Sequence, residues 1–567
     1  MKAEDVRLTE LLEGPKQFIV PVFQRDYSWG TKHCLQLWKD ILRVGSDENA
    51  KAHFVGSIVY VAAEENSAKI TRWLLIDGQQ RLTTITLLLT ALRNRLPAID
   101  ANPQVSTDDG LPTRPELEDY YLCNTHGKGD RRQKLSLRRA DQNTLVALLD
   151  SKELPKDRSE RIRENYEFFD EQLASADLDL VYRGIKKLVA VDVSLARGQD
   201  DPQMIFESLN STGLDLTQAD LIRNFVLMRQ DEEVQTQLYN DYWQPVEIAF
   251  GARYRNEFDK FVRDYLTLQL RPSKQLKADE IYQHFRTFFY SVQATTPIAN
   301  ILSELKRFGG YYVAFSLGQE ESPEIKEALG RLRQLVEVAS PVVMRLYDCH
   351  SQTNTLTAEQ FVKAVELLES YVFRRSVCDM QTRNLGQIFA SLAYRIKDDN
   401  PLLSLQVALY RQGKKRRFPS DAEFREALET RDVYDMRQCH YLLDRLENDS
   451  KEQIETSGFT IEHVMPQNEE ISPDWQKMLG SEWQSVWEVW LHRLGNVTLT
   501  GYNSEYSDKS FPDKKTIPGG FNESPLRLNK FIREQNQWTA TEMEKRGRIL
   551  QRRLSVFGPF SRWILKQ

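Results

Sequence analysis

The sequence predicts a multidomain α+β protein, with an α/β N-terminal module, a helical middle and a smaller mixed unit at the C-terminus. Three observations favour this fold class. A chain of 567 residues is too long for one hydrophobic core, so we expect about three to four domains. Strand and helix patterns alternate near the N-terminus, whereas residues 226–446 carry helical periodicity. We therefore place the domains at 1–230, 231–447 and 448–567.

The N-terminal elements follow from short β-rich runs and one long apolar stripe. Strands are predicted at 18–23, 54–61, 73–76 and 187–193. After the third strand, apolar residues recur at helical spacing, so a helix begins near Gln79 or Gln80. The stripe consists of Leu82, Ile85, Leu88, Leu89 and Leu92. The stretch 101–119 is rich in proline, glycine and aspartate, which predicts a loop or insertion.

The middle of the chain contains apolar stripes that predict packed helices. One stripe runs through Phe258, Phe261, Val262, Tyr265 and Leu266, and another through Phe361, Val365, Leu368, Tyr371 and Val372. Such stripes are typical of a helix face buried in a core, not of a ligand pocket. The polar stretch 448–457 is the predicted linker to the C-terminal unit.

Composition excludes several classes of protein. Hydrophobic residues make up 41% and charged residues 28% of the chain, as in ordinary folded proteins. No apolar run approaches the ~20 residues of a membrane span, and the acidic N-terminus has no signal-peptide pattern. The five cysteines include no C-x-x-C pair, which argues against a zinc ribbon or a disulfide framework. We expect a cytoplasmic protein without membrane contact.

The net charge of −6 does not by itself indicate a nucleic-acid-binding protein, so any such contact must use local patches. Three basic patches occur, at 128–139, at 411–417 and in the tail from Arg527 onward. Each patch has two readings, a phosphate contact or a solvated helix face or loop.

The chemistry of the C-terminal unit centres on residues 461–467. Glu462 and His463 end a predicted strand, Pro466 follows, and an asparagine cluster comes later at Asn496 and Asn503. A carboxylate and a carboxamide oxygen can hold a hard divalent cation, and a neutral imidazole can take a proton from an attacking water. This combination favours a one-metal phosphodiesterase site. A buried, hydrogen-bonded core histidine is the alternative for His463.

The N-terminal module has a second polar constellation, Asp77-Gly78-Gln79-Gln80-Arg81, where a strand turns into a helix. The glycine permits positive φ, the helix start offers free N–H groups to an anion, and the arginine suits phosphate. A turn, a surface arginine and a helix cap are the structural alternative. No G-x-x-x-x-G-K-[ST] motif is present, which argues against a Walker-type NTPase.

Four motifs in order resemble a known N-terminal module. They are Gln24–Trp29, His53–Ile58, Ile76–Thr84 and Leu209–Asn224. Together they resemble the ParB/sulfiredoxin-like module of GmrSD-type modification-dependent restriction enzymes and of the phosphorothioate-sensing SspE nucleases. The resemblance implies binding and hydrolysis of GTP or another NTP. The implied nucleotide-binding residues are Gln24, Arg25, Asp77, Gly78, Gln79, Gln80, Arg81, Asn210 and Arg223.

Residues 455–555 resemble the companion nuclease domain, a member of the His-Asn-His (HNH, ββα-metal) superfamily. The resemblance implies His463 as general base, with Glu462 and Asn503 holding Mg²⁺ or Mn²⁺. Asn496 would fix the loop of the catalytic motif, and Lys514, with Lys509 and Lys515 as alternatives, would contact the scissile phosphate. Glu462 stands where an aspartate is common, and the long, Trp-rich interval before Asn496 requires an inserted helix.

The expected function is a modification-dependent DNA endonuclease of bacterial anti-phage defence, which nicks or cleaves modified or phage DNA. NTP hydrolysis in the N-terminal module would gate the metal-dependent nuclease. Two alternatives stay open: a ParB-related DNA-binding regulator with a degenerate nuclease domain, and an RNA-cleaving toxin. A homodimer is also left open, as is the DNA modification that is sensed.

Overall fold

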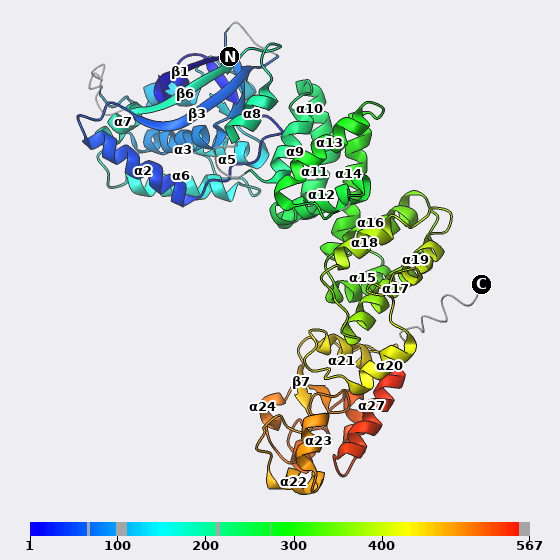
Figure 1. The fold of residues 1–567 in the computed structure, drawn as a ribbon. Helices are drawn as coiled ribbons and strands as arrows, with labels where there is room; N and C mark the ends of the chain where they lie inside the picture. Colours follow the sequence, from blue (N-terminus) through cyan, green and yellow to red (C-terminus); the bar gives the residue numbers. More distant parts are fainter. Residues whose placement is uncertain (65–68, 98–109, 211–215, 273, 555–567) are drawn as a thin grey trace. The chain divides into compact units, whose positions relative to one another are not determined.

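The computed structural model describes residues 1–64, 69–97, 110–210, 216–272 and 274–554, with the backbone alone at 209 and 210. The chain forms two units, Met1–Glu247 and Ile248–Gln567. Figure 1 shows that the first is built around a sheet and that the second begins as a series of helices. The predicted multidomain organisation, with an N-terminal mixed sheet and a helical middle, is confirmed. Within the described ranges, no helix has the length and apolar character needed to cross a membrane.

The described part of the first unit forms a six-stranded mixed sheet in the order β1-β6-β3-β4-β2-β5. β1 pairs antiparallel with β6 and β3 antiparallel with β4, whereas the β3–β6, β2–β4 and β2–β5 pairs are parallel. The strands are β1 Lys2–Arg7, β2 Lys16–Ile19, β3 His53–Ala62, β4 Thr71–Asp77, β5 Leu135–Ser136 and β6 Leu188–Leu195.

Helices α2, α3 and α6 lie along one face of this sheet (Figure 1). The helices of the unit are α1 Leu8–Leu12, α2 Thr31–Ser46, α3 Gln79–Arg95, α4 Arg114–Leu117, α5 Arg139–Leu149, α6 Glu160–Leu173, α7 Leu178–Lys186, α8 Pro202–Asn210, α9 Gln218–Leu227 and α10 Glu232–Leu238; α11, Gln244–Phe250, spans the boundary. The predicted stripe of α3 is buried in the core between helices and sheet. This packing fixes where α3 begins, and so fixes the Asp77–Arg81 motif.

Three N-terminal predictions differ from the structure. The strand predicted at 18–23 is β2, which begins at Lys16 and ends at Ile19, before Pro21. Strand β1 was not expected, because it is an exposed edge strand whose charged residues give no hydrophobic signal. The predicted loop 101–119 lies partly outside the described residues, and its described end is helical at Arg114–Leu117. Pro115 is compatible with a helix there because it stands in the first turn, where its missing N–H costs no hydrogen bond.

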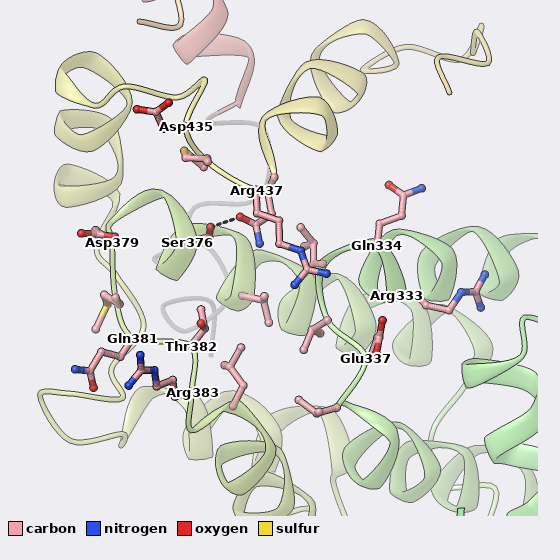
Figure 2. A pocket seen from close by; sticks show the side chains of 18 of the residues that line it. Arg333, Gln334, Glu337, Ser376, Asp379, Gln381, Thr382, Arg383, Asp435 and Arg437 are labelled. Atoms are coloured by element: carbon pink, nitrogen blue, oxygen red, sulfur yellow. Dashed lines mark hydrogen bonds between the residues drawn. The ribbon is translucent and has the colours of Figure 1, made fainter. Parts of the chain in front are cut away.

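The second unit begins with the predicted helices, whose stripes are buried as expected. They are α12 Tyr254–Leu270, α13 Ile281–Gln293, α14 Ile298–Ser316, α15 Pro323–Leu335, α16 Ser340–Tyr347, α17 Ala358–Val377, α18 Leu385–Ala393, α19 Pro401–Tyr410, α20 Asp421–Thr430 and α21 Cys439–Glu447. A cavity lies beside the C-terminal ends of α15 and α17 (Figure 2).

The C-terminal part of this unit pairs two short strands and surrounds them with helices. Its elements are β7 Thr460–His463, α22 Pro473–Leu479, α23 Trp483–Trp490, β8 Val497–Thr500, α24 Asn503–Tyr506, α25 Phe511–Thr516, α26 Arg527–Glu534 and α27 Ala540–Leu554. The Trp-rich interval therefore forms two helices, and Trp475 is fully buried in the local core. The predicted linker 448–457 has neither helix nor strand.

Gly78, which separates β4 from α3, adopts φ +92°. A methyl group there would lie 2.5 Å from Cδ1 of Ile58 and 2.9 Å from the carbonyl oxygen of Ser57. Gly129 provides a matched control, because its φ is +60° but no atom lies within 4 Å of its Cβ position.

We therefore expect Gly78→Ala to lower the stability of the first unit by about 2–4 kcal/mol, and Gly129→Ala by about 1 kcal/mol. The difference measures crowding beyond backbone strain. Hydrogen exchange of the α3 amides, followed by mass spectrometry in the full chain, reports both variants. Equal loss of protection in the two variants would contradict the steric argument.

Candidate functional site

Glu462 and His463 end strand β7, and β8 holds them in register. Glu462 lies opposite Thr498 and His463 opposite Val497 in the antiparallel pair. Consecutive residues of a strand point to opposite faces, so the carboxylate and the imidazole leave the strand in different directions. Both side chains are buried, at 4% and 5% exposure. The predicted catalytic pair is therefore part of the interior of the domain.

Asn496 locks the turn that follows β7. Its side-chain oxygen accepts hydrogen bonds from Met465 N at 2.8 Å and Trp538 Nε1 at 3.1 Å. Its amide nitrogen donates to the carbonyl oxygens of Met465 at 3.1 Å and Leu491 at 2.9 Å. All four hydrogen-bonding positions of the amide are used, and the residue is fully buried. Asn496 is thus placed to hold the motif in shape.

The His463 ring is enclosed by three polar or aromatic groups. Nε2 lies 3.1 Å from Nδ1 of His492, and the Gln467 amide nitrogen lies 2.6 Å from Nδ1 of His463. Tyr434 stacks on His492 and meets His463 edge-on, with ring centroids 4.4 Å apart. Burial above all, with His492 and Lys514 adding to it, lowers the pKa of His463 to about 3. The ring is uncharged at neutral pH, as a proton acceptor must be.

Sequence reasoning did not find these neighbours of His463. His492 was given no role from the sequence, yet its ring nitrogen faces that of His463. The available signal was position, because Gln467 stands four residues after His463 and His492 four residues before Asn496. Tyr434 precedes α21 and gave no signal at all.

Lys514 forms a buried ion pair with Glu462. Its Nζ donates to Glu462 Oε1 at 2.7 Å and to the carbonyl oxygen of His463 at 2.9 Å, and its side chain has no exposed surface. Burial raises the pKa of Glu462 and lowers that of Lys514, while each charge opposes the shift of the other. The lysine predicted to contact DNA therefore supports the carboxylate predicted to hold the metal.

Asn503, at the start of α24, is exposed and donates from Nδ2 to the carbonyl oxygen of Ile461 at 3.1 Å. Its side-chain oxygen is thereby turned away from that bond. A carboxylate and a carboxamide oxygen are donors of the type that Mg²⁺ accepts, with water and phosphate completing the shell. In the part of the chain that the structure describes, no cluster of three His, Cys, Asp or Glu side chains could hold a metal alone.

In the first unit, Asp77 and Arg81 flank the turn between β4 and α3. Arg81 donates from Nη1 to the carbonyl oxygen of Ser57 at 2.6 Å and lies 3.5 Å from Asp77 Oδ2. The guanidinium packs against Gly56, where a methyl group would lie 2.7 Å from Arg81 Nε. Both charged side chains keep about a third of their surface exposed, at 27% for Asp77 and 30% for Arg81. They are the accessible charged groups of the motif.

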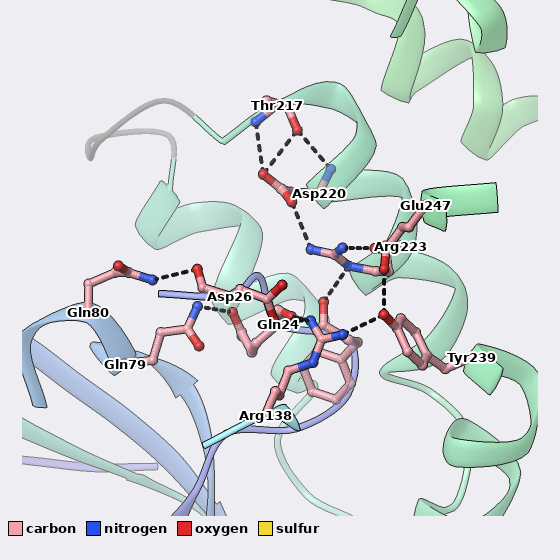
Figure 3. A network of polar contacts seen from close by, with 11 residues as sticks. Gln24, Asp26, Gln79, Gln80, Arg138, Thr217, Asp220, Arg223, Tyr239 and Glu247 are labelled. Atoms are coloured by element: carbon pink, nitrogen blue, oxygen red, sulfur yellow. Dashed lines mark hydrogen bonds and ion pairs between the residues drawn. The ribbon is translucent and has the colours of Figure 1, made fainter. Parts of the chain in front are cut away.

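The two glutamines of the motif hold the segment 24–29, as Figure 3 shows. Gln80 Oε1 accepts from the backbone N–H groups of Ser28 at 2.8 Å and Trp29 at 3.2 Å. Gln79 Nε2 donates to Gln24 Oε1 at 3.2 Å, and Gln24 Nε2 donates to the carbonyl oxygen of Ile76 at 2.8 Å. All three glutamines are buried. Gln24, Gln79 and Gln80 therefore lie together, and their side chains are already hydrogen-bonded to protein.

Arg223, on α9, joins this network from the other side (Figure 3). It donates to the carbonyl oxygen of Phe23 at 2.8 Å and to Asp220 at 2.8 Å, and it pairs with Glu247. Arg138 donates to Tyr239 at 2.5 Å and to the carbonyl oxygen of Gln24. Arg138, Tyr239 and Glu247 could not be identified from the sequence as members of this network, because they are far apart along the chain and share no motif.

Two predicted nucleotide-binding residues are less well placed. Arg25 is half-buried in the same segment. Asn210 ends α8, and its side chain lies outside the described residues.

The basic patches are partly internal. Lys134 is buried and donates to three carbonyl oxygens, and burial lowers its pKa to about 8. Arg546 is fully buried against the backbone of 494–497, and burial lowers its pKa to about 9. Arg553 pairs with Asp449. Within the 411–417 patch, in contrast, Lys414 and Lys415 are exposed.

Two family models match this sequence, and each covers one of the two regions described above. The family model "GmrSD restriction endonuclease, N-terminal domain" matches residues 8–227, which contain the sheet and the Asp77–Arg81 motif. The model "GmrSD restriction endonucleases, C-terminal domain" matches residues 418–553, which contain Glu462, His463 and Asn496. No curated protein matches the chain. The two matched domains together span more than half of the sequence, in the order of one protein, and the chain therefore belongs to the GmrSD restriction endonuclease family.

Proposed function

We propose that this protein is a modification-dependent DNA endonuclease in which NTP hydrolysis by the first unit gates a metal-dependent, HNH-type nuclease site at β7. The restriction endonuclease domains make DNA the substrate. The observation that carries the nuclease site is the uncharged His463 at a strand end, beside Glu462 and above the locked Asn496 turn. A general base must be held in a fixed orientation, and the hydrogen bonds of Asn496 hold the turn that follows His463.

His463 would accept the proton of the water that attacks the phosphate. A base with a pKa of about 3 is weak, since the ideal catalytic pKa lies near the working pH. Bound DNA would correct this, because the negative charge of a phosphate beside the ring raises the pKa of an imidazole. The site would then become active only with substrate in place. His492 and Gln467 would keep the ring oriented during proton transfer.

Glu462 and Asn503 would hold Mg²⁺ or Mn²⁺, and the bound cation would stabilise the negative charge that develops on the phosphate. The Lys514 ammonium already neutralises one oxygen of Glu462, which leaves Oε2 as the atom available to a cation. Asn503 contributes an exposed carboxamide from α24.

The proposed gate is the strand-to-helix turn at Asp77. The first-turn N–H groups of α3 and the partly exposed Arg81 suit the phosphates of a GTP or other NTP. Asp77 could orient a water or a cation. Because Gln79 and Gln80 clamp the segment 24–29, a nucleotide that disturbs this turn would also move that segment, which passes the signal to Arg223 and α9.

His463→Ala should reduce nicking of plasmid by about 10²–10⁴-fold, because a positioned general base contributes that much. NTP turnover should be retained. His284→Ala, on α13, is the control and should nick normally. The measurement compares nicking with Mg²⁺ or Mn²⁺, with chelator, and on unmodified and modified phage DNA. Loss of both activities in His463→Ala would refute the two-site arrangement, and cleavage of RNA alone would refute the DNA assignment.

Lys514→Met should destabilise the C-terminal part by about 3–5 kcal/mol, because it leaves the buried Glu462 carboxylate unpaired. Lys515→Met is the matched neighbour, whose half-buried ammonium donates to the carbonyl oxygen of Gln535, and it should cost less. Adding Glu462→Gln to Lys514→Met should recover stability. Urea unfolding, followed through hydrogen exchange of the β7 and β8 amides, measures the stability of each variant and so ranks them. Unchanged stability with weakened DNA binding would instead assign Lys514 to the phosphate.

Arg81→Ala should lower NTP affinity about 10–100-fold, since a hydrogen bond to a charged group contributes about 1.5–3 kcal/mol. Arg183→Ala, exposed on α7, serves as the control. Nucleotide titration and turnover are measured beside nicking. A gate requires that nicking change together with turnover; independence of the two activities would eliminate gating while leaving the nuclease site intact.

A further inference from the structure

The cavity in the helical part of the second unit has no role in the proposed nuclease or in the proposed NTP site. It measures about 870 Å³, within the range of small-molecule sites. Its walls come from the ends of α15 and α17, the loop before α18 and the segment 431–438 before α21 (Figure 2). These segments are distant in sequence, so the fold builds the cavity by bringing separate elements together.

Four arginines line this cavity, and they differ in how far the protein uses them. Arg431 is committed, since it donates to the carbonyl oxygens of Ser376 and Val377 and pairs with Asp379 at 3.2 Å. Arg333 donates from Nη1 to the carbonyl oxygen of Phe315 at 2.6 Å. Arg383 and Arg437 are exposed, and neither has a hydrogen-bond or ion-pair partner among the described residues. Figure 2 shows the Arg437 side chain directed among the lining residues.

A guanidinium without a partner inside the protein contributes little to the stability of the fold and remains available to a ligand. A planar guanidinium is the side chain best suited to hold a phosphate by two hydrogen bonds. Arg383 and Arg437 come from different walls, so they could approach one phosphate from two directions. This arrangement favours a ligand with phosphate charge.

The rest of the lining suits a heterocyclic base. Buried apolar side chains, among them Val372, Leu385 and Met436, form part of the wall. Glu337 and Asp435 offer carboxylates that can accept hydrogen bonds from exocyclic amino groups, and Gln334 and Gln381 offer amides that both donate and accept. A ligand with a phosphate at one end and a flat, hydrogen-bonding ring at the other would match both the arginines and the rest of the cavity lining.

We propose that this cavity is a second nucleotide-binding site, with Arg383 and Arg437 on the phosphate and the apolar wall against the base. The ligand is either a free nucleotide or one nucleotide unit of a nucleic-acid strand, because both present the same chemistry. The inference does not depend on the catalytic assignment of His463 or on nucleotide binding by the first unit.

Photo-crosslinking in the full-length protein tests the site directly. The probes are azido-ATP, azido-GTP and an iodouracil-containing single-stranded DNA, and adducts are mapped by mass spectrometry. We expect adducts in the peptides covering 376–385 or 431–438. The double variant Arg383→Ala/Arg437→Ala should reduce these adducts at least tenfold. Arg395→Ala, exposed just after α18 and outside the cavity, should leave them unchanged.

The outcomes separate the sources of the ligand and can overturn the proposal. Adducts with the azido-nucleotides alone assign a free nucleotide, and adducts with the oligonucleotide alone assign a strand. Adducts confined to the first unit, or cavity adducts that persist undiminished in a double variant with normal circular dichroism, would refute the site.

Discussion

The buried ion pair between Glu462 and Lys514 is the interaction on which the nuclease region depends. Two charges removed from water each lose several kcal/mol of hydration, so neither side chain can remain there without the other. The pair also joins β7 to α25, because the same ammonium holds the carbonyl oxygen of His463. Strand, helix and candidate base are therefore placed by one contact. A divalent cation arriving at Glu462 would share a carboxylate that the protein has already half neutralised.

In the first unit, the residues of the Asp77–Arg81 motif also divide into two groups, buried side chains that hold the structure and side chains that remain exposed. The amides of Gln79 and Gln80 form hydrogen bonds with the segment 24–29, whereas the charged groups of Asp77 and Arg81 stay accessible to solvent. In the second unit, Asn496 has a purely structural place, because its side chain makes four hydrogen bonds inside the protein. The Asp77–Arg81 motif thus combines two side chains whose charges stay accessible with two side chains whose hydrogen bonds hold the turn in place. Family resemblance alone does not distinguish the two kinds, but hydrogen-bond saturation does.

Elements with a strong local signal could be predicted from the sequence. The start of the helix after Gly78 was predicted near Gln79 or Gln80, because its apolar stripe and its glycine agree, and α3 begins at Gln79. The strands β3 and β6 were predicted because they carry buried apolar residues. Edge strand β1 escaped because its partner, β6, lies about 190 residues away and its own residues are polar. Two partners of the His463 ring, Tyr434 and His492, were missed for a related reason, because they meet it only through tertiary packing. Lys514 was named from the sequence, but as a phosphate contact and not as the partner of Glu462.

The distribution of positive charge follows from how the arginines are used. Lys134, Arg138 and Arg546 are buried, so two of the three basic patches direct part of their charge into the protein. The 411–417 patch differs, because buried Arg375 holds its backbone through the carbonyl oxygens of Lys415 and Arg417, at 3.4 Å and 3.3 Å. The same guanidinium donates to the carbonyl oxygen of Gln381, in the loop that lines the cavity. One buried arginine therefore orders both an exposed basic loop and the wall that carries Arg383.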